Sequence, residues 1–192
     1  LWKLLLTSFL IGANWGVYIW AVRIDRLLDA SLGYFICPII KAGLGFFLLN
    51  EELNRFKKIS LSMVAISVLF LAAFYQIFPW VALTLATTVG AYALLHKVWG
   101  LGFELALKTE TFLVAMLLLP VFLYQQSQIE YGIELTRLLP LAGLATLAPL
   151  LPYHLAIKRI DLSLLGFLQF IVPTINFVLA VFFLGEKFDT AK

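Results

Sequence analysis

The chain has 192 residues, of which 62% are apolar and 13% are charged, and its formal net charge is +3. Soluble domains carry about a quarter charged residues, so this composition excludes an ordinary soluble protein. The small positive charge lies between long apolar runs, so nucleic acid is not an expected partner. The single cysteine, Cys37, lies within an apolar run and has no partner for a disulfide.

The runs without charged residues are long enough to cross a hydrocarbon core of about 30 Å as helices. The longest run, from Ile59 to His96, must form two spans with a break just before Pro79. Strands are not expected, because barrel strands alternate in short segments and these runs are apolar on all faces. We predict seven membrane helices at residues 4–22, 28–49, 59–77, 79–96, 109–125, 138–157 and 163–184.

A polar and aromatic patch lies in the first predicted helix. It consists of Asn14 and Trp15, with Tyr18 one helical turn further on. Tyrosine and tryptophan are typical of the membrane interface, so an interfacial position is one interpretation. The other interpretation is that the patch flanks an internal cavity.

One face of the second predicted helix carries Tyr34, Pro38, Lys41 and Gly45, at helical spacing. Lys41 lies near the middle of this span, where a lysine costs about 2.5–3.5 kcal/mol on insertion scales. We therefore expect Lys41 to meet water, a substrate anion, a carbonyl group or an acid from another helix. Snorkelling of its amino group to the interface is the alternative.

The stretch from Tyr18 to Leu53 is repeated without gaps 135 positions further along the chain. Identical residues recur at matched positions, among them Tyr18 and Tyr153, Pro38 and Pro173, and Glu51 and Glu186. The residues that correspond in the repeat to the polar face of the second helix are Gln169, Pro173, Asn176 and Ala180. An internal repeat in a very apolar chain is typical of transporters built from two similar halves.

The repeat predicts that the two polar faces point into the helix bundle, because polar groups that face lipid are costly. They either line a substrate cavity at the repeat interface or form hydrogen bonds that hold the halves together. Pro38 and Pro173 predict kinks at matched positions of the two helices, because each proline removes a backbone hydrogen bond. Either the carbonyl groups freed in this way face the cavity, or the kinks are purely structural bends. Glu51 and Glu186 lie at the ends of their helices. Their carboxylates either make a capping or loop contact or have a functional role, and both interpretations stay open.

The repeat spacing corresponds to five helices, and an odd number of helices inverts the second copy in the membrane. Two inverted repeats of five helices require ten, so we expect this chain to hold the third to ninth. Residues 1–77 then form an incomplete first repeat, and residues 78–192 a second repeat without its last helix. By the same arithmetic roughly 60 residues precede Leu1 and roughly 20–30 follow Lys192.

Basic residues favour one side of the membrane. The N-terminus and every second loop lie on the same side of the membrane, and this side holds eight lysine and arginine residues. The opposite side holds five. By the positive-inside rule the richer side is cytoplasmic.

Three segments resemble a known family. They are IGANWGVYIWAV at 11–22, DASLGYFICPII at 29–40 and FFLLNEELNRFKK at 46–58, and a fourth, at 162–188, is similar to the late helix pair of the same proteins. These are the RarD-type proteins of the EamA group, in the drug/metabolite transporter superfamily. The resemblance implies ten helices in two inverted repeats. It also implies either export of amino acids, drugs and related metabolites or exchange of sugar nucleotides and phosphates. Lys41 departs from it, since the family usually has a neutral polar residue there.

The sequence thus predicts a secondary transporter, a permease or exporter in the bacterial cytoplasmic membrane, that moves small drug-like or amino-acid-like metabolites. Exchange of anionic, phosphate-bearing metabolites is the alternative, because Lys41 would contribute charge. A seven-helix retinal protein or receptor is a remote alternative, against which the repeat argues. We expect no enzyme, cofactor or metal site, since His96 and His154 lie near the ends of different helices and no catalytic motif is present. The oligomeric state is open.

Overall fold

The computed structural model describes the chain except for residues 25, 76–77, 127–132, 172–174 and 176–192. Within the described residues the protein is helical and contains no strand, which confirms the predicted all-α class for this part. The helices are α1 (Trp2–Arg23), α2 (Leu27–Leu49), α3 (Arg55–Tyr75), α4 (Trp80–Trp99), α5 (Phe103–Gln126), α6 (Ile133–Arg159) and α7 (Leu162–Leu168).

Several helices begin earlier than predicted. Helices α3, α5 and α6 start at Arg55, Phe103 and Ile133, four to six positions before the predicted starts. Hydropathy marks the apolar part of a helix, whereas backbone hydrogen bonding continues through its polar first turns. The earlier start of α5 matters below, because Glu110 then lies seven residues after the first residue of the helix.

The last predicted helix, at residues 163–184, is described only in its first part. Helix α7 ends at Leu168, and the amides of Gln169 and Phe170 donate to carbonyl groups only three residues back. The prediction of one uninterrupted helix is therefore wrong at this turn. Pro173, Asn176 and Glu186 lie outside the described residues.

Three helices within the described part of the chain are long and apolar enough to cross a membrane. They are Trp2–Arg23, Ala30–Leu49 and Trp80–Trp99. The protein is thus an all-helical membrane protein. The other four predicted spans, and the arrangement in two five-helix repeats, stay predictions.

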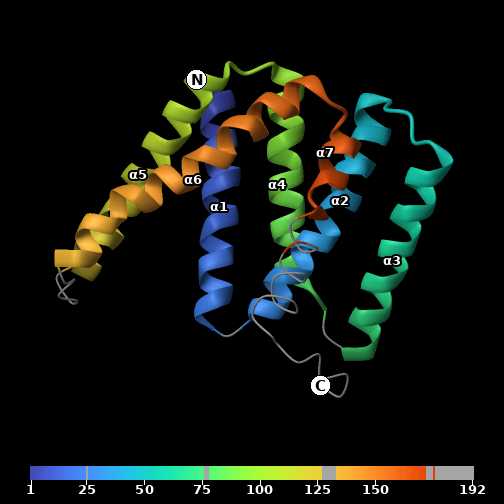
Figure 1. Ribbon diagram of the computed structural model, residues 1–192, viewed down its shortest axis with the longest axis horizontal. Coiled ribbons are helices and arrows are strands. Elements are labelled where there is room, and N and C mark those ends of the chain that lie inside the picture. The colour runs from blue at the N-terminus through green and yellow to red at the C-terminus, as the bar shows by residue number, and fades with distance from the viewer. Residues whose placement is uncertain (25, 76–77, 127–132, 172–174, 176–192) are drawn as a thin grey trace.

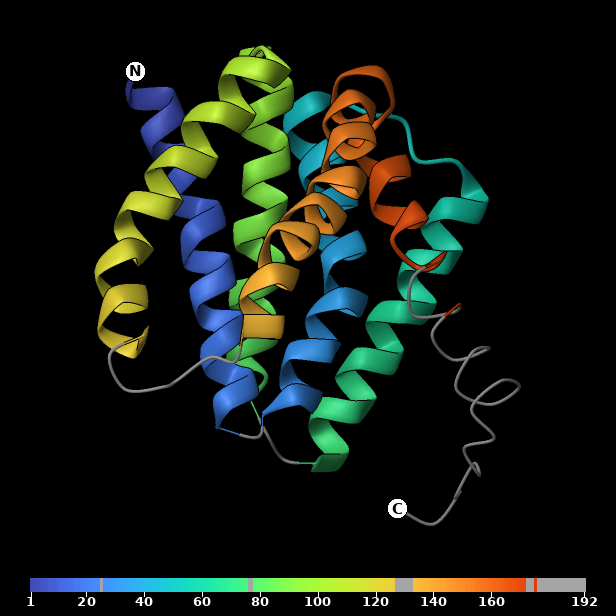
Figure 2. The same cartoon turned by 60° about the vertical axis from the view of Figure 1, so that its left-hand side comes forward.

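Helix α2 lies at the centre of the packing, against α3, α4 and α7, while α1 packs on α4 and α5 (Figure 1). Small residues bring α2 and α4 together: a Cβ on Gly33 would lie 3.3 Å from the carbonyl oxygen of Ala82. Close backbone approach at small residues is the usual mode of helix packing in membranes. Helices α1 and α6 run in opposite directions, and so do α2 and α7 (Figures 1 and 2). Inverted repeats would require this arrangement.

Candidate functional site

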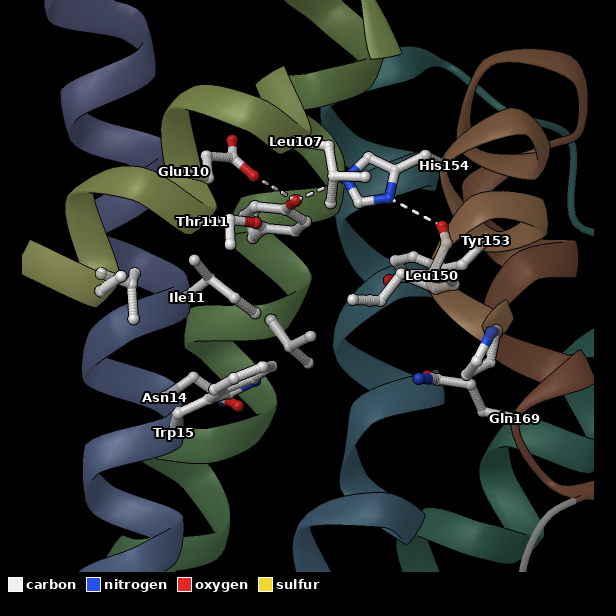
Figure 3. A pocket seen from close by; sticks show the side chains of 15 residues that line it. Ile11, Asn14, Trp15, Leu107, Glu110, Thr111, Leu150, Tyr153, His154 and Gln169 are labelled. Atoms are coloured by element: carbon white, nitrogen blue, oxygen red, sulfur yellow. Dashed lines mark hydrogen bonds between the residues drawn. The ribbon is translucent and has the colours of Figure 1, made fainter. Parts of the chain in front are cut away.

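A cavity of about 530 Å³ lies among α1, α4, α5, α6 and the residue that follows α7 (Figure 3). Its wall is mainly aliphatic and aromatic. The polar side chains that reach it are those of Asn14, Tyr92, Glu110, Thr111, Tyr153, His154 and Gln169. A second cavity of about 80 Å³ lies beside it, and the two share Asn14, Val89 and Gln169 as lining residues.

The structure brings most of the residues predicted as cavity candidates to these two spaces. Asn14, Trp15, Tyr153 and Gln169 line the larger cavity, and Tyr18 and Tyr34 join Asn14 and Gln169 around the smaller one. Tyr34 and Trp15 are 47% and 40% exposed, so their rings are not enclosed. Asn176, the repeat partner of Lys41, lies outside the described residues.

Asn14 is held in place by two hydrogen bonds to α4. Its amide nitrogen donates to the carbonyl oxygen of Leu85 at 2.9 Å and to the hydroxyl of Thr88 at 2.8 Å. The amide therefore contributes to packing between α1 and α4 as well as to the cavity wall.

Lys41 is fully buried and does not snorkel to an interface. Its Nζ donates to the hydroxyl of Tyr153 at 2.9 Å and to Oε1 of Gln169 at 3.0 Å, and lies 5.0 Å from the centre of the Tyr153 ring. Among the described residues, no carboxylate forms a salt bridge with Lys41. A cation held by two neutral acceptors and an aromatic face keeps its positive charge uncompensated beside the cavity.

Gly166 explains how the partners of Lys41 come so close to α2. A Cβ at this position would lie 3.0 Å from Cα of Pro38 and 3.3 Å from Cβ of Lys41. Only glycine fits such an approach without a shift of the backbone. Pro38 lies buried inside α2 at this crossing, so the predicted kink position is also the contact with α7.

Glu51 makes the capping contact that the sequence left open. Asn50 ends α2 in the left-handed conformation, with φ of 54°, and turns the chain back toward α7. The Glu51 carboxylate then accepts the amides of Leu162 and Ser163 at 2.6 and 2.9 Å. Lys97 lies 3.8 Å from the same carboxylate. This contact satisfies amides of the first turn of α7 that have no partner within the helix.

A buried polar network was missed by the sequence analysis. Glu110 of α5 accepts hydrogen bonds from Thr7 of α1 at 2.6 Å and from the hydroxyl of Tyr92 of α4 at 2.7 Å. Nε2 of His96 lies 2.8 Å from Oε1 of Glu110, the oxygen that also accepts from Thr7. The Tyr92 hydroxyl also lies 2.7 Å from Nε2 of His154, on α6. Figure 3 shows Glu110 and His154 pointing toward one another from opposite walls.

The expectation that the two histidines are unrelated is therefore wrong. Donor atoms of His96, Glu110 and His154 lie within 4.8 Å of one another, and each side chain is buried. Glu110 itself is only 4% exposed. Each of these donor atoms already makes a hydrogen bond at 2.6–2.9 Å, which makes the group a hydrogen-bonded network.

A signal for this network was present in the helix lengths. The connection between α4 and α5 is three residues long, so the end of α4 and the start of α5 lie close together. His96 lies three residues before the end of α4 and Glu110 seven residues after the start of α5, so both lie within about two helical turns of that connection. Glu110 was placed at a helix end because hydropathy alone does not detect the first turns of α5.

Comparison with known proteins shows similarity to bacterial transporters over nearly the whole chain. The chain is 40% identical to "Uncharacterized transporter YojE" of Bacillus subtilis, covering 99% of this chain and 65% of that protein. It is 36% identical to an "Uncharacterized transporter" of Vibrio cholerae, covering 100% and 65%, and 36% identical to "Protein RarD" of Escherichia coli K12, covering 97% and 65%. No protein-family model and no solved structure matches the chain.

The fold and cavity define a helical integral membrane protein with an internal polar site. The predicted resemblance to RarD-type proteins is confirmed by these similarities. The chain spans about 65% of the length of the relatives named above.

Proposed function

We propose that this chain forms most of a secondary transporter that moves small drug-like or amino-acid-like metabolites across the bacterial cytoplasmic membrane. The observation that carries this proposal is the cavity of about 530 Å³ inside the helix bundle. Its volume lies within the range of about 300–1,000 Å³ that small-molecule sites occupy. Its mainly apolar wall with a few converging polar groups is also typical of such sites.

The two predicted repeats both contribute to the cavity. Asn14 and Trp15 come from residues 1–77, whereas Tyr153 and Gln169 come from residues 78–192. Lys41 joins these halves through its hydrogen bonds to Tyr153 and Gln169. A site at the interface of two repeats supports transport by movement of one half against the other. The similarity to proteins named as transporters supports the same function rather than an enzymatic one.

Exchange of anionic, phosphate-bearing metabolites is the second candidate. The observation in its favour is the charge of Lys41, which its two neutral acceptors leave uncompensated. Against it, Lys41 lies behind the Tyr153 and Gln169 side chains, which line the cavity themselves. Among the described residues that line the larger cavity there is no lysine or arginine. We therefore favour substrates that are partly apolar.

The test uses the full-length protein in proteoliposomes and a panel of labelled solutes. The panel includes chloramphenicol, because a relative in Pseudomonas aeruginosa, 27% identical, carries the name "Chloramphenicol-sensitive protein RarD". It also includes amino acids and sugar phosphates. We expect saturable uptake of a partly apolar solute and none of sugar phosphates. Uptake of sugar phosphates alone would support the anion exchanger.

Two variants test the paired polar faces. Lys41→Ala and Asn176→Ala should each reduce transport, while Lys108→Ala, which removes an exposed lysine, should not. If transport is unchanged by both substitutions, the paired faces do not form the substrate site.

A further inference from the structure

The hydrogen-bond chain formed by Glu110, Tyr92 and His154 needs one more proton than these groups carry in their usual forms. Nδ1 of His154 lies 2.9 Å from the carbonyl oxygen of Leu150. A carbonyl group can only accept, so Nδ1 carries a proton, and Nε2 of a neutral His154 carries none.

The Tyr92 hydroxyl has one proton for two contacts of 2.7 Å, one to Glu110 Oε2 and one to His154 Nε2. If it donates to an ionised Glu110, the contact with a neutral His154 has no hydrogen. If it donates to His154, the contact with an ionised Glu110 has none. A contact of 2.7 Å between two lone pairs is repulsive, so the geometry requires one additional proton.

We propose that Glu110, Tyr92 and His154 form a proton-binding site whose occupancy is coupled to transport through the adjacent cavity. The bound proton has two positions. In one, Glu110 is protonated and donates to the Tyr92 oxygen, while Tyr92 donates to a neutral His154. In the other, Glu110 is ionised, Tyr92 donates to it, and His154 is cationic. Conversion moves one proton from Glu110 to Tyr92 and one from Tyr92 to His154, and Tyr92 stays a neutral phenol throughout.

Burial favours an occupied site, whereas the neighbouring positive charges oppose it. Helix α1 contributes the neutral Thr7, and α4 contributes His96, and both contact Glu110 Oε1. On α6 the neighbouring groups are Tyr153, which holds Lys41 of α2, and Lys158, whose positive charge disfavours a cationic His154. With the proton bound, the three-residue chain is neutral overall. Without it, one negative charge remains among side chains that are at most 4% exposed, which is unfavourable.

Proton release gives a physical route to coupling, and this step rests on the proposed transport function. All three residues line the cavity, so protons and substrate reach the same space. Once the proton leaves, Tyr92 of α4 can hold Glu110 of α5 or His154 of α6, but not both. Release therefore weakens one of the two contacts that join these helices across the cavity wall. The position of α5 and α6 then depends on protonation, which is the requirement for a switch between two states.

The first arm of the test detects the proton directly and does not depend on transport. Infrared difference spectra of the full-length protein in lipid are recorded between about pH 5 and pH 8. We expect a carbonyl band of a buried carboxylic acid that is lost in Glu110→Gln and kept in Glu104→Gln, an exposed acid of the same helix. Tyr92→Phe removes the hydroxyl that joins Glu110 to His154. In this variant the carboxyl signal of Glu110 and the imidazole signal of His154 should therefore titrate independently of one another. A band that persists in Glu110→Gln, or an unchanged titration in Tyr92→Phe, would overturn the proposal.

The second arm separates coupling from transport itself. In proteoliposomes with labelled chloramphenicol, an imposed pH gradient should drive uptake in the wild type, and the ratio of gradient-driven uptake to counterflow should fall in Glu110→Gln and Tyr92→Phe. Counterflow without any response to the gradient would leave the proposed function standing and overturn the coupling.

A third measurement adds zinc to the full-length protein. Stoichiometric zinc binding that is lost in Glu110→Gln would make this a metal site and overturn the proton assignment.

Discussion

Two polar clusters meet at adjacent residues of α6 and differ in how they hold charge. Tyr153 belongs to the Lys41 cluster, in which one cation donates to two neutral acceptors. His154 belongs to the Glu110 cluster, in which an acid, a phenol and an imidazole contact one another. Both clusters are buried, and residues of both line the same cavity.

This contrast identifies the cluster that can change its charge. Every contact of the Lys41 cluster is satisfied with the lysine in its ordinary charged form, so nothing in its geometry calls for a proton to move. The Glu110 cluster contains three groups that exchange donor and acceptor roles, and its contacts depend on the number of protons present. We infer that the Lys41 cluster supplies a fixed charge and that the Glu110 cluster supplies a variable one. The following predictions test that contrast in order of expected effect.

Glu110→Leu should have the largest effect. The substitution removes the acceptor for Thr7, Tyr92 and His96 at once, and leaves their polar groups buried without it. Breaking such a charged network by removal of one partner costs about 3–5 kcal/mol. The free energy of unfolding in mixed lipid–detergent micelles measures the loss. Glu104→Leu is the matched control, since Glu104 is exposed, and an equal loss there would remove the special status of Glu110.

Gly166→Ala should have the next largest effect, and it acts on the Lys41 cluster alone. The new methyl group would lie 3.0 Å from Cα of Pro38, so α7 must shift away from α2. Overpacking of this kind costs about 1–3 kcal/mol, and the shift should also weaken the bond between Lys41 and Gln169. Gly43→Ala is the control, because no atom lies within 4 Å of its added Cβ. Equal stability of the two variants would contradict the close contact.

The contrast between the clusters also explains what could be predicted from sequence. Lys41 and Gln169 were found because the repeat marks polar positions within apolar runs, and Tyr153 was found as the repeat of Tyr18. A repeat detects positions that occur twice. No residue of this chain lies 135 positions before or after Glu110, so the repeat could not identify it.

Helix ends account for most of the remaining errors. Hydropathy located the three helices that are long and apolar enough to cross a membrane, but it shortened α3, α5 and α6, because polar first turns are helical without being apolar. This error left Glu110 next to the predicted start of its helix. Contacts between distant helices, such as Tyr92 with His154, depend on three-dimensional packing that periodicity along one helix does not encode.

A matched pair of tyrosine substitutions compares the clusters directly. Tyr92→Phe removes the hydroxyl that joins Glu110 to His154, and both partners are buried. The expected loss of stability is about 1–2 kcal/mol. Tyr153→Phe removes one of two acceptors of Lys41 and leaves Gln169 in place, so the loss should be smaller, below about 1 kcal/mol. Unfolding of both variants under the same conditions gives the comparison, and a larger loss for Tyr153→Phe would reverse it.

Lys41→Met should have the smallest effect on stability, although Lys41 is fully buried. Methionine fills a similar space without a charge, which removes the cost of keeping a cation away from water. Tyr153 and Gln169 line the cavity, where water can replace the lost donor. Replacing a buried charge by an apolar side chain of similar size is often neutral, so we expect a change within about 1 kcal/mol. A loss as large as that of Glu110→Leu would mean that Lys41 is part of a coupled network too, and that its charge is not simply fixed.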